Sequence, residues 1–417
     1  MTRRKILLVA FHFPPIQGST GTTRTVAFSR FLEELGWNVQ VLTIRPSAYE
    51  RTSHENDDLI PVGVSVKRSW GVDTRSSLSA MGRYPLILAI PDRWQSWIAG
   101  AYLDGSKIIR SWRPDVIMTT YPIPSAHVIG ILLKKKFKLP WVAEFRDPML
   151  QDKYPDTSLQ RWAYGKIERA VFRAADEIVV TTDLCRQTYS DRYPDFPSSR
   201  ITTISNGYDP EIFSRSAPKN NRQEQSRVVL LHSGLLYPHE RNPDQFFEAV
   251  RQLAADGFLN PADVEFRFRA SSNEDTYTKK TKVLGIEKFI TFLPNISYVE
   301  ALEEMQSVDA LMIFQADNSS EQIPAKIYEY FYCRKPVLGL TDPTSATGQL
   351  LASVGVPYIA SLEDVSKIKT AIRDLLVQLE QGREFLVSDN DIHRFSRRNL
   401  TSDLDLVLLR AINAQMT

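Results

Sequence analysis

The chain has 417 residues, with 51 lysine and arginine side chains against 49 aspartate and glutamate side chains. Hydrophobic residues make up 43% and charged residues 24%, which excludes disordered, collagenous and membrane-spanning classes. At roughly 100–200 residues per domain, this length predicts two domains or one large one. Two distant cysteines, Cys185 and Cys333, provide neither a disulfide framework nor a metal-ligand spacing, so the composition fits a reducing cytoplasm.

The two halves of the chain carry opposite net charge. Residues 1–215 contain 29 basic and 22 acidic side chains, and residues 216–417 contain 22 and 27, which gives +7 and −5. A basic half suits anionic partners such as phosphates or a lipid surface. The excess is far below that of a typical nucleic-acid binder, so no nucleic-acid partner is expected.

The first half alternates short apolar strands with amphipathic helices. The apolar run at 6–13 is short and ends at Pro14-Pro15, so a buried strand is expected there rather than a signal peptide. Strands are expected in KILLVAF, NVQVLTI, DVIMTT, PWVAEF, EIVVTT and RITTIS, and helices at 24–35, 125–137 and 159–174. This alternation predicts a parallel sheet covered by helices on both faces.

A polar stretch at 214–227 separates a second series of strands from the first. Strands are expected in VVLLHSG, VEFRFRA, FITFL, DALMIF, PVLGL and PYIA, and helices at 243–255, at 298–307 and from residue 325. The sequence therefore predicts an α/β protein with two doubly wound, Rossmann-like domains at 1–215 and 216–395. Ligands of such sheets bind at the carboxyl ends of the strands, so two facing sheets would form a cleft.

The loop after the first strand has the residues to hold an anion. Gly18 and Gly21 permit a tight turn, and Ser19, Thr20 and Thr22 supply hydroxyls and amides at a helix start. The segment matches neither the Walker loop nor the GxGxxG pattern. A ligand-binding loop and a plain connection are equally good interpretations of this pattern.

Two further strands run into polar turns bounded by proline, YPIPSAH and EFRDPM. His127 and the group of Glu144, Arg146 and Asp147 should therefore lie at the carboxyl ends of neighbouring strands. Such positions suit catalysis. A structural histidine and a satisfied ion pair are nevertheless the more frequent roles of such residues.

The segment SSEQIPAKIYEYFYCRKPVLGL carries two carboxylates eight residues apart. Glu321 follows an apolar strand, and Glu329 lies inside a helix that is expected to begin at Pro324. A buried glutamate needs a partner such as a ribose diol or a sugar hydroxyl, and Lys326 offers a positive charge to a phosphate. A capping Glu321 and a surface Glu329 are the alternative.

The segment VVLLHSGLLYPHERNPDQFF opens the second half with a strand, a glycine turn and a helix. Gly234 permits close approach of the backbone to a ligand, and Arg241 precedes the helix that Asn242 and Pro243 begin. A diphosphate would fit between them. A solvent-facing arginine is the plainer interpretation.

In their order and separation, these four segments resemble glycosyltransferase family 4, the retaining GT-B enzymes, and in particular its bacterial polysaccharide and glycolipid branch. The resemblance spans nearly the whole chain, and its most specific element is the spacing from Glu321 to Glu329. It implies the GT-B fold, in which the first domain binds the acceptor and the second binds a nucleotide sugar. It also implies that a C-terminal helix at 396–417 crosses back to the first domain.

The resemblance implies a role for each matching residue. The implied catalytic residues are Glu321, Asp147 and His127. The residues implied to bind the diphosphate and nucleotide of the donor are Gly18, Ser19, Thr20, Gly21, Ser233, Gly234, Arg241, Lys326 and Glu329. No metal or other cofactor is expected, because the nucleotide sugar is a co-substrate.

The chain departs from the family pattern at two places. Family members commonly have Gly-Arg-Leu and then Lys-Gly in the fourth segment, whereas this chain has Gly234-Leu235-Leu236 and then Arg241-Asn242. One of the two usual cations is therefore absent or supplied from elsewhere. Residues 322–326 replace the common Gly-Phe-Gly, so the contacts that select the donor sugar do not transfer.

We therefore expect a cytoplasmic, retaining glycosyltransferase that moves a sugar from a nucleotide sugar to a glycan or lipid-linked acceptor. Backbone amides and cations would stabilise the departing nucleoside diphosphate without a metal. A sugar-nucleotide epimerase of the same fold and a catalytically silent partner subunit are the alternatives.

A basic and apolar segment, LLKKKFKLPW, is a candidate for peripheral membrane contact. It contains Lys134, Lys135, Lys136 and Lys138. Each lysine near an anionic leaflet contributes about 1 kcal/mol of binding free energy. Contact with the inner face of the membrane and a solvated helix end, with lysines at the negative end of the helix dipole, are both consistent with this pattern.

Overall fold

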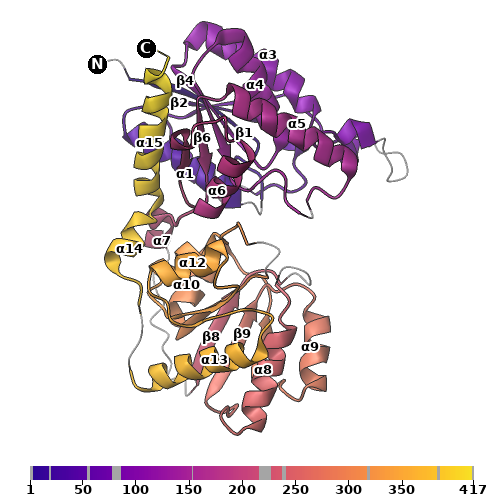
Figure 1. Ribbon diagram of the computed structural model, residues 1–417, viewed down its shortest axis with the longest axis vertical. Helices are drawn as coiled ribbons and strands as arrows, with labels where there is room; N and C mark the ends of the chain where they lie inside the picture. The colour runs from indigo at the N-terminus through magenta and orange to yellow at the C-terminus, as the bar shows by residue number, and fades with distance from the viewer. Residues whose placement is uncertain are drawn as a thin grey trace. The chain divides into compact units, whose positions relative to one another are not determined.

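The protein is described here by a computed structural model (Figure 1), which describes residues 3–17, 20–53, 57–77, 86–152, 154–215, 227–236, 241–316, 320–382 and 386–415. The chain divides into two compact units. The first comprises residues 1–206 together with 397–417, and the second comprises residues 207–396.

The first unit is built on a parallel sheet of seven strands in the order β3-β2-β1-β4-β5-β6-β7. In the central strand, Leu8 lies opposite Val41 on one side and Met118 on the other. The strands are β1 (Lys5–Ala10), β2 (Asn38–Ile44), β3 (Ser65–Ser69), β4 (Val116–Thr120), β5 (Trp141–Phe145), β6 (Glu177–Val180) and β7 (Ile201–Thr203). β4 and β5 are buried along their whole length, as their mainly apolar sequences predict.

Helices cover both faces of this sheet. α3, α4 and α5 pack side by side in one layer, and α1 packs against α15 in the layer on the other face (Figure 1). The helices of the unit are α1 (Thr20–Glu34), α2 (Thr74–Ser77), α3 (Ser96–Trp112), α4 (Pro124–Phe137), α5 (Ser158–Ala174), α6 (Asp183–Arg192) and α15 (Arg397–Asn413).

Strand β3 was not predicted from the sequence. It is an edge strand, paired only with β2 among the strands described, and its first four residues alternate between exposed and half-buried positions. A polar edge strand lacks the apolar run that identifies a buried strand, and the hydrogen bonds of its neighbour supply its stability instead.

The C-terminal helix α15 belongs to the first unit, although the 190 residues of the second unit (207–396) separate it in sequence from the rest of the first. It packs along α1 (Figure 1), where Arg398 forms an ion pair with Glu34. Trp37 Nε1 donates a hydrogen bond of 2.7 Å to Asp405 Oδ1. The apolar side of α15 is fully buried, with Leu404, Val407, Leu408 and Ala411 at 0% exposure.

The second unit contains a parallel sheet of six strands in the order β10-β9-β8-β11-β12-β13. The strands are β8 (Val228–Ser233), β9 (Val264–Arg269), β10 (Ile290–Leu293), β11 (Ala310–Phe314), β12 (Val337–Leu340) and β13 (Ile359–Ala360). The helices are α7 (Pro210–Arg215), α8 (Asp244–Ala255), α9 (Glu274–Val283), α10 (Tyr298–Ser307), α11 (Lys326–Tyr332), α12 (Ala346–Ser353), α13 (Val365–Glu380) and α14 (Asp389–Arg394). Two doubly wound parallel sheets, as predicted, are thereby confirmed.

Within the described ranges, no helix combines the length and the apolar character that crossing a membrane requires.

Burial of α15 gives a test of the first unit's packing. We expect Leu408→Ala to lower the free energy of unfolding by about 2–5 kcal/mol, because it removes a fully buried side chain. All seven tryptophans lie within residues 1–206, so tryptophan fluorescence during urea unfolding follows this unit. The control is Leu406→Ala on the same helix, where the side chain is 57% exposed and a change within about 0.5 kcal/mol is expected. Equal losses for both variants would show that α15 does not pack as described.

Candidate functional site

In the first unit, the candidate residues gather at the carboxyl edge of the sheet. β1, β4 and β5 are parallel neighbours, so the segments that follow them leave the sheet at the same edge. His12 follows β1, and Arg146 and Asp147 follow β5 directly. This edge therefore collects side chains that are more than 130 residues apart in the sequence.

Gly21 allows the start of α1 to contact Arg146. A Cβ atom at Gly21 would overlap Arg146 Nη1 and would lie 2.9 Å from His12 Nδ1. Only glycine permits so close an approach of helix backbone and guanidinium. Burial, assisted by the charge of Arg146, lowers the pKa of His12 to about 3, so His12 is neutral at pH 7.

One N–H group of the Arg146 guanidinium forms no hydrogen bond with the described residues. This group is Nε–H, which is buried. Because a guanidinium stays protonated in proteins, Arg146 brings a permanent positive charge to the start of α1, where the helix dipole also favours an anion. Arg146 was selected from the sequence as part of the EFRD turn, but its contact with the start of α1 at Gly21 was not predicted.

Glu144 is committed to a structural ion pair. Arg24 Nε lies 2.8 Å from Glu144 Oε1, and both side chains are almost fully buried. Arg24 also donates hydrogen bonds to the carbonyl oxygens of Ser205, at 2.6 Å, and Ile204, at 2.8 Å. This network joins α1, β5 and the end of β7, so Glu144 already has a partner.

Asp147 is a half-buried carboxylate that forms no hydrogen bond or ion pair with the residues described. Burial raises its pKa, and the neighbouring Arg146 partly opposes that rise. A carboxylate of this kind can exchange a proton or accept a hydrogen bond from a bound hydroxyl. Its environment therefore suits the catalytic role that the family resemblance implies.

His127 lies in the core of the first unit rather than at its surface. It is 0% exposed, and its ring lies 4.6 Å from that of Phe145. Thr119 Oγ1 lies 2.8 Å from Nδ1, and Nε2 has no partner within the described ranges. Burial lowers the pKa of His127 to about 3, so the ring is neutral at pH 7. The structure does not expose His127 beside Asp147.

Part of the predicted loop lies outside the described residues. Gly18 and Ser19 are in this group, and Thr20 is described only as the first residue of α1. The loop prediction is therefore carried by Gly21 and its contact with Arg146 alone.

In the second unit, Lys326 lies against the end of β8. Its ammonium donates a hydrogen bond to the carbonyl oxygen of Ser233, and a Cβ atom at Gly234 would overlap Lys326 Nζ. Gly234 has φ of +130°, a conformation that side chains other than glycine rarely adopt. The backbone conformation therefore favours glycine at this position, and the absence of a side chain lets the lysine ammonium lie against the backbone.

Arg241 brings a second cation to the same place. Its Nη1 donates to the carbonyl oxygen of Leu235 at 3.3 Å, one residue after Gly234. Burial first, and then the charge of Arg241, lower the pKa of Lys326 to about 7, and Glu329 partly opposes the shift. Lys326 and Arg241 thus place two positive charges beside Gly234.

Glu329 lies one turn after Lys326 on the short helix α11. Tyr298, the first residue of α10, donates a hydrogen bond of 2.5 Å to Glu329 Oε1. Glu329 is half-buried, so one face of its carboxylate is fixed while the side chain remains accessible. This differs from the solvated surface glutamate that was the alternative interpretation.

Glu321 is half-buried in a loop whose backbone is firmly held. The carbonyl oxygen of Gln322 accepts hydrogen bonds from Gln315 Nε2, at 2.9 Å, and Thr347 Oγ1, at 3.2 Å. The carbonyl oxygen of Ser320 accepts one from the Ala346 amide at 2.7 Å. The loop between β11 and α11 is therefore anchored to the start of α12, which fixes the backbone that carries Glu321.

Sequence reasoning missed two tyrosines of this site. Tyr298 lies 31 residues before Glu329, and nothing in the intervening sequence indicates their contact. The Tyr330 hydroxyl accepts a hydrogen bond of 3.2 Å from the Ser233 amide, which ties α11 to β8. Tyr330 belongs to the YEY segment. The only indication of its role in the sequence is that a tyrosine, when buried, needs a hydrogen-bond partner for its hydroxyl.

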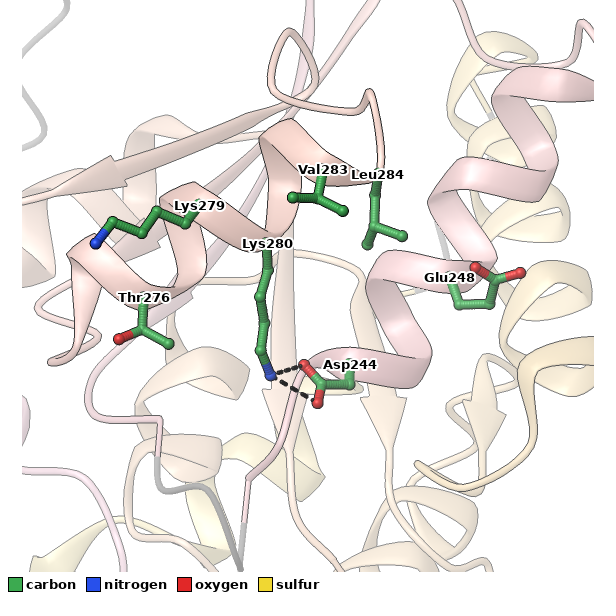
Figure 2. Close-up of a pocket in the computed structure, with 7 residues that line it drawn as sticks. All are labelled: Asp244, Glu248, Thr276, Lys279, Lys280, Val283 and Leu284. Atoms are coloured by element: carbon green, nitrogen blue, oxygen red, sulfur yellow. Dashed lines mark hydrogen bonds and ion pairs between the residues drawn. The ribbon is translucent and has the colours of Figure 1, made fainter.

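A separate groove of about 520 Å³ lies between α8 and α9 (Figure 2). Lys280 Nζ crosses it to Asp244, at 2.6 Å from Oδ1 and 2.8 Å from Oδ2. Its lining comprises Asp244, Glu248, Thr276, Lys279, Lys280, Val283 and Leu284. It contains none of the predicted site residues, so the groove and the candidate site are distinct.

In the ranges that the structure describes, no group of three or more His, Cys, Asp or Glu side chains is arranged to hold a metal ion.

Residues 20–207 match the sequence family described as "Glycosyl transferase 4-like domain". No curated protein matches the chain significantly. Among solved structures, sucrose-phosphate synthase from Thermosynechococcus elongatus aligns with a TM-score of 0.69 and 13% identity, over 99% of this chain and 100% of its own.

Two further structures show the same likeness. HepE of Anabaena, in complex with UDP, aligns with a TM-score of 0.67 and 15% identity, over 97% of this chain and 99% of its own. WaaG, a glycosyltransferase involved in lipopolysaccharide biosynthesis, aligns with a TM-score of 0.61 and 15% identity, over 98% and 99%. At these identities the likeness establishes the fold, and the predicted GT-B fold is confirmed.

The Arg24–Glu144 pair provides a test of the first unit's site. We expect Arg24→Met to lower the free energy of unfolding by about 3–5 kcal/mol, because it leaves the Glu144 carboxylate buried without its partner. The matched control is Lys67→Met, which removes a 3.6 Å ion pair between Asp104 and a lysine that is 47% exposed. A change below about 1 kcal/mol is expected there. Tryptophan fluorescence during urea unfolding measures both, and a loss for Arg24→Met no larger than the control's would contradict the described network.

Proposed function

We propose that the chain is a glycosyltransferase whose second unit binds the nucleoside diphosphate of a sugar donor. The observation that carries this proposal is the convergence of Lys326 and Arg241 on Gly234, with Glu329 on the same short helix as Lys326. Two cations suit a diphosphate, and a carboxylate oriented by Tyr298 suits the hydroxyl pair of a ribose.

The relatives support this proposal. The first unit matches a glycosyl transferase 4-like domain, and solved structures of the same fold hold UDP, UDP-glucose, or UDP together with glucose. We propose a nucleotide sugar as donor and a glycan or lipid-linked acceptor that binds the first unit. A cytoplasmic location at the inner face of the membrane, in polysaccharide or glycolipid synthesis, is part of the same proposal.

The proposed chemistry depends on stabilising the negative charge of the departing nucleoside diphosphate. When the bond between sugar and phosphate breaks, negative charge grows on the diphosphate, and Lys326 and Arg241 would stabilise it. Two fixed cations in a half-buried site act more strongly than they would in water. We therefore propose that transfer proceeds with retention and without a metal, so that activity would persist in a chelator.

Three residues are proposed to act near the reacting sugar. Asp147 would accept a hydrogen bond or a proton, since no described group occupies it, and Glu321 would contact the donor sugar from its anchored loop. His127 would act through its neighbours, because it lies in the core against Phe145.

A panel of UDP, GDP, ADP and their sugars tests donor binding. We expect one nucleotide class to raise the melting temperature of the wild type by mass action. Glu329→Gln should weaken the affinity about 10- to 100-fold, since hydrogen bonds to a charged group contribute roughly 1.5–3 kcal/mol. The exposed Glu287→Gln is the control, for which an unchanged shift is expected. The proposal is wrong if no nucleotide shifts the melting temperature.

Turnover separates the alternatives. A transferase releases free nucleoside diphosphate only when acceptor is added, an epimerase converts the donor without any acceptor, and a silent subunit binds without turnover. Anabaena HepE is known with UDP and glucose together, so glucose is a reasonable first acceptor to try.

The pKa of Lys326 predicts how donor affinity depends on pH. With its pKa lowered to about 7, Lys326 is charged below pH 7 and becomes neutral above it. A diphosphate binds the charged form, so binding must take up a proton at higher pH. We expect the dissociation constant for UDP-glucose, measured by calorimetry, to rise by up to tenfold per pH unit between about pH 7.5 and 9.

Lys326→Arg is the control for this dependence, because an arginine remains charged throughout the range. Its dissociation constant should change little with pH. An equal slope in the variant and the wild type would assign the dependence to another group.

A further inference from the structure

We propose that Tyr154 and Asp147 form a subsite for a saccharide unit of the acceptor, at the carboxyl edge of the first unit's sheet. The proposal rests on the proposed function and adds to it the chemical class of the acceptor and the side chain that holds it. Tyr154 lies in the connector between β5 and α5, after the EFRD turn and before the first residue of α5.

The connector is held in place by arginines of the two helices that follow it. Arg161 of α5 inserts its Nη1 among the connector's carbonyl oxygens and donates to those of Gln151, at 2.7 Å, and Tyr154, at 3.1 Å. Arg192, the last residue of α6, donates from Nη2 to the carbonyl oxygen of Leu150 at 3.1 Å. Side chains carried on a backbone fixed in this way keep a defined position for a ligand.

The hydroxyl of Tyr154 is also fixed. It lies 3.3 Å from the Tyr164 hydroxyl of α5, and the two rings meet edge to face with their centroids 5.9 Å apart. Burial raises the pKa of Tyr121, and nearby Tyr154 and Tyr164 raise it further, Tyr154 in part through a side-chain hydrogen bond. Tyr121 is 2% exposed and Tyr164 is 4% exposed. The polar end of Tyr154 is therefore anchored by buried hydroxyls.

The ring of Tyr154, in contrast, reaches solvent. The residue is 43% exposed, although its hydroxyl lies against two tyrosines of the core. A tyrosine has only two side-chain torsions, so a ring that is already anchored loses little conformational entropy when a ligand packs on it. This tyrosine thus offers a rigid, apolar surface at the edge where the candidate residues of the unit gather.

Asp147 lies beside the same cluster. The Tyr121 amide donates a hydrogen bond of 3.0 Å to the carbonyl oxygen of Glu144, which places the end of β4 against the EFRD turn. The charge of Asp147 accordingly acts on Tyr121, the neighbour that it shares with Tyr154. Asp147 forms no hydrogen bond or ion pair with the residues described, so its carboxylate oxygens can accept hydrogen bonds from a ligand.

An apolar ring near a carboxylate suits the two kinds of surface that a sugar presents. A pyranose carries hydroxyl groups around its rim and C–H groups on its faces. The negative face of an aromatic ring attracts C–H groups, and a carboxylate accepts hydrogen bonds from hydroxyls. An alkyl chain could pack on the ring of Tyr154 but would leave the Asp147 carboxylate without a hydrogen bond. The pair therefore favours a saccharide.

Saturation-transfer NMR on the full chain tests the subsite with the methyl glycosides of glucose, galactose, mannose and N-acetylglucosamine. Spectra are recorded first without nucleotide and then with UDP. We expect the C–H protons of at least one glycoside to receive saturation from the protein, because its face would lie on the ring of Tyr154. Donor binding is measured separately, by the shift in melting temperature that nucleotides cause.

Variants locate the contact. Tyr154→Ala should weaken glycoside binding about tenfold or more, whereas Tyr154→Phe keeps the ring and should stay within about threefold of the wild type. Asp147→Asn should weaken it about tenfold, because a hydrogen bond to a charged group is lost. The control is Trp162→Ala, which removes a ring that is 61% exposed on α5. It should bind glycosides as the wild type does.

The nucleotide-induced shift in melting temperature should be the same in Tyr154→Ala and the wild type, which separates loss of the subsite from a general loss of structure. A wild type that receives no signal from any glycoside would overturn the proposal, and a nucleotide shift in the same protein would leave donor binding intact. Equal losses in Tyr154→Ala and Trp162→Ala would also overturn it. Signal from octyl phosphate alone would assign the ring to a lipid chain instead.

Discussion

The parallel alignment of the strands is the constraint on which the rest of this structure depends. Because β1, β4 and β5 point the same way, the polar segments that follow them leave the first sheet at one edge, and His12, Arg146 and Asp147 come together there. The same holds for β8, β11 and β12 in the second unit, where Gly234 and the loop that carries Glu321 leave one edge.

Each edge is then organised by a cation that contacts glycine. Arg146 lies against Gly21 in the first unit, and Lys326 lies against Gly234 in the second. In both places the missing side chain lets a positive charge approach the backbone closely. Burial, and after it the charge of Arg241, lowers the pKa of Lys326, while Glu329 partly opposes the shift.

Much of the fold could be predicted because buried strands leave a strong signal. β4, β5 and β11 are buried along their whole length; β11 is a continuous apolar run, and β4 and β5 depart from one only at Thr119, Thr120 and Glu144. β3 was missed because an edge strand has no such run. Among site residues, the position of Glu329 on a short helix was predicted, whereas its hydrogen bond with Tyr298 was not, since 31 residues separate the two.

The sequence alone determined the two doubly wound sheets, the positions of the glycine turns and the residues that follow each strand, because these depend on local periodicity and on backbone freedom. The tertiary structure decided which charged and polar groups are paired or buried. It paired Glu144 with Arg24 and Lys134 with Asp176, enclosed His127 in the core, and gave Asp147 no hydrogen bond or ion pair to any residue that the structure describes. Pairing and burial arise from contacts between residues far apart in the chain, and no local pattern encodes them.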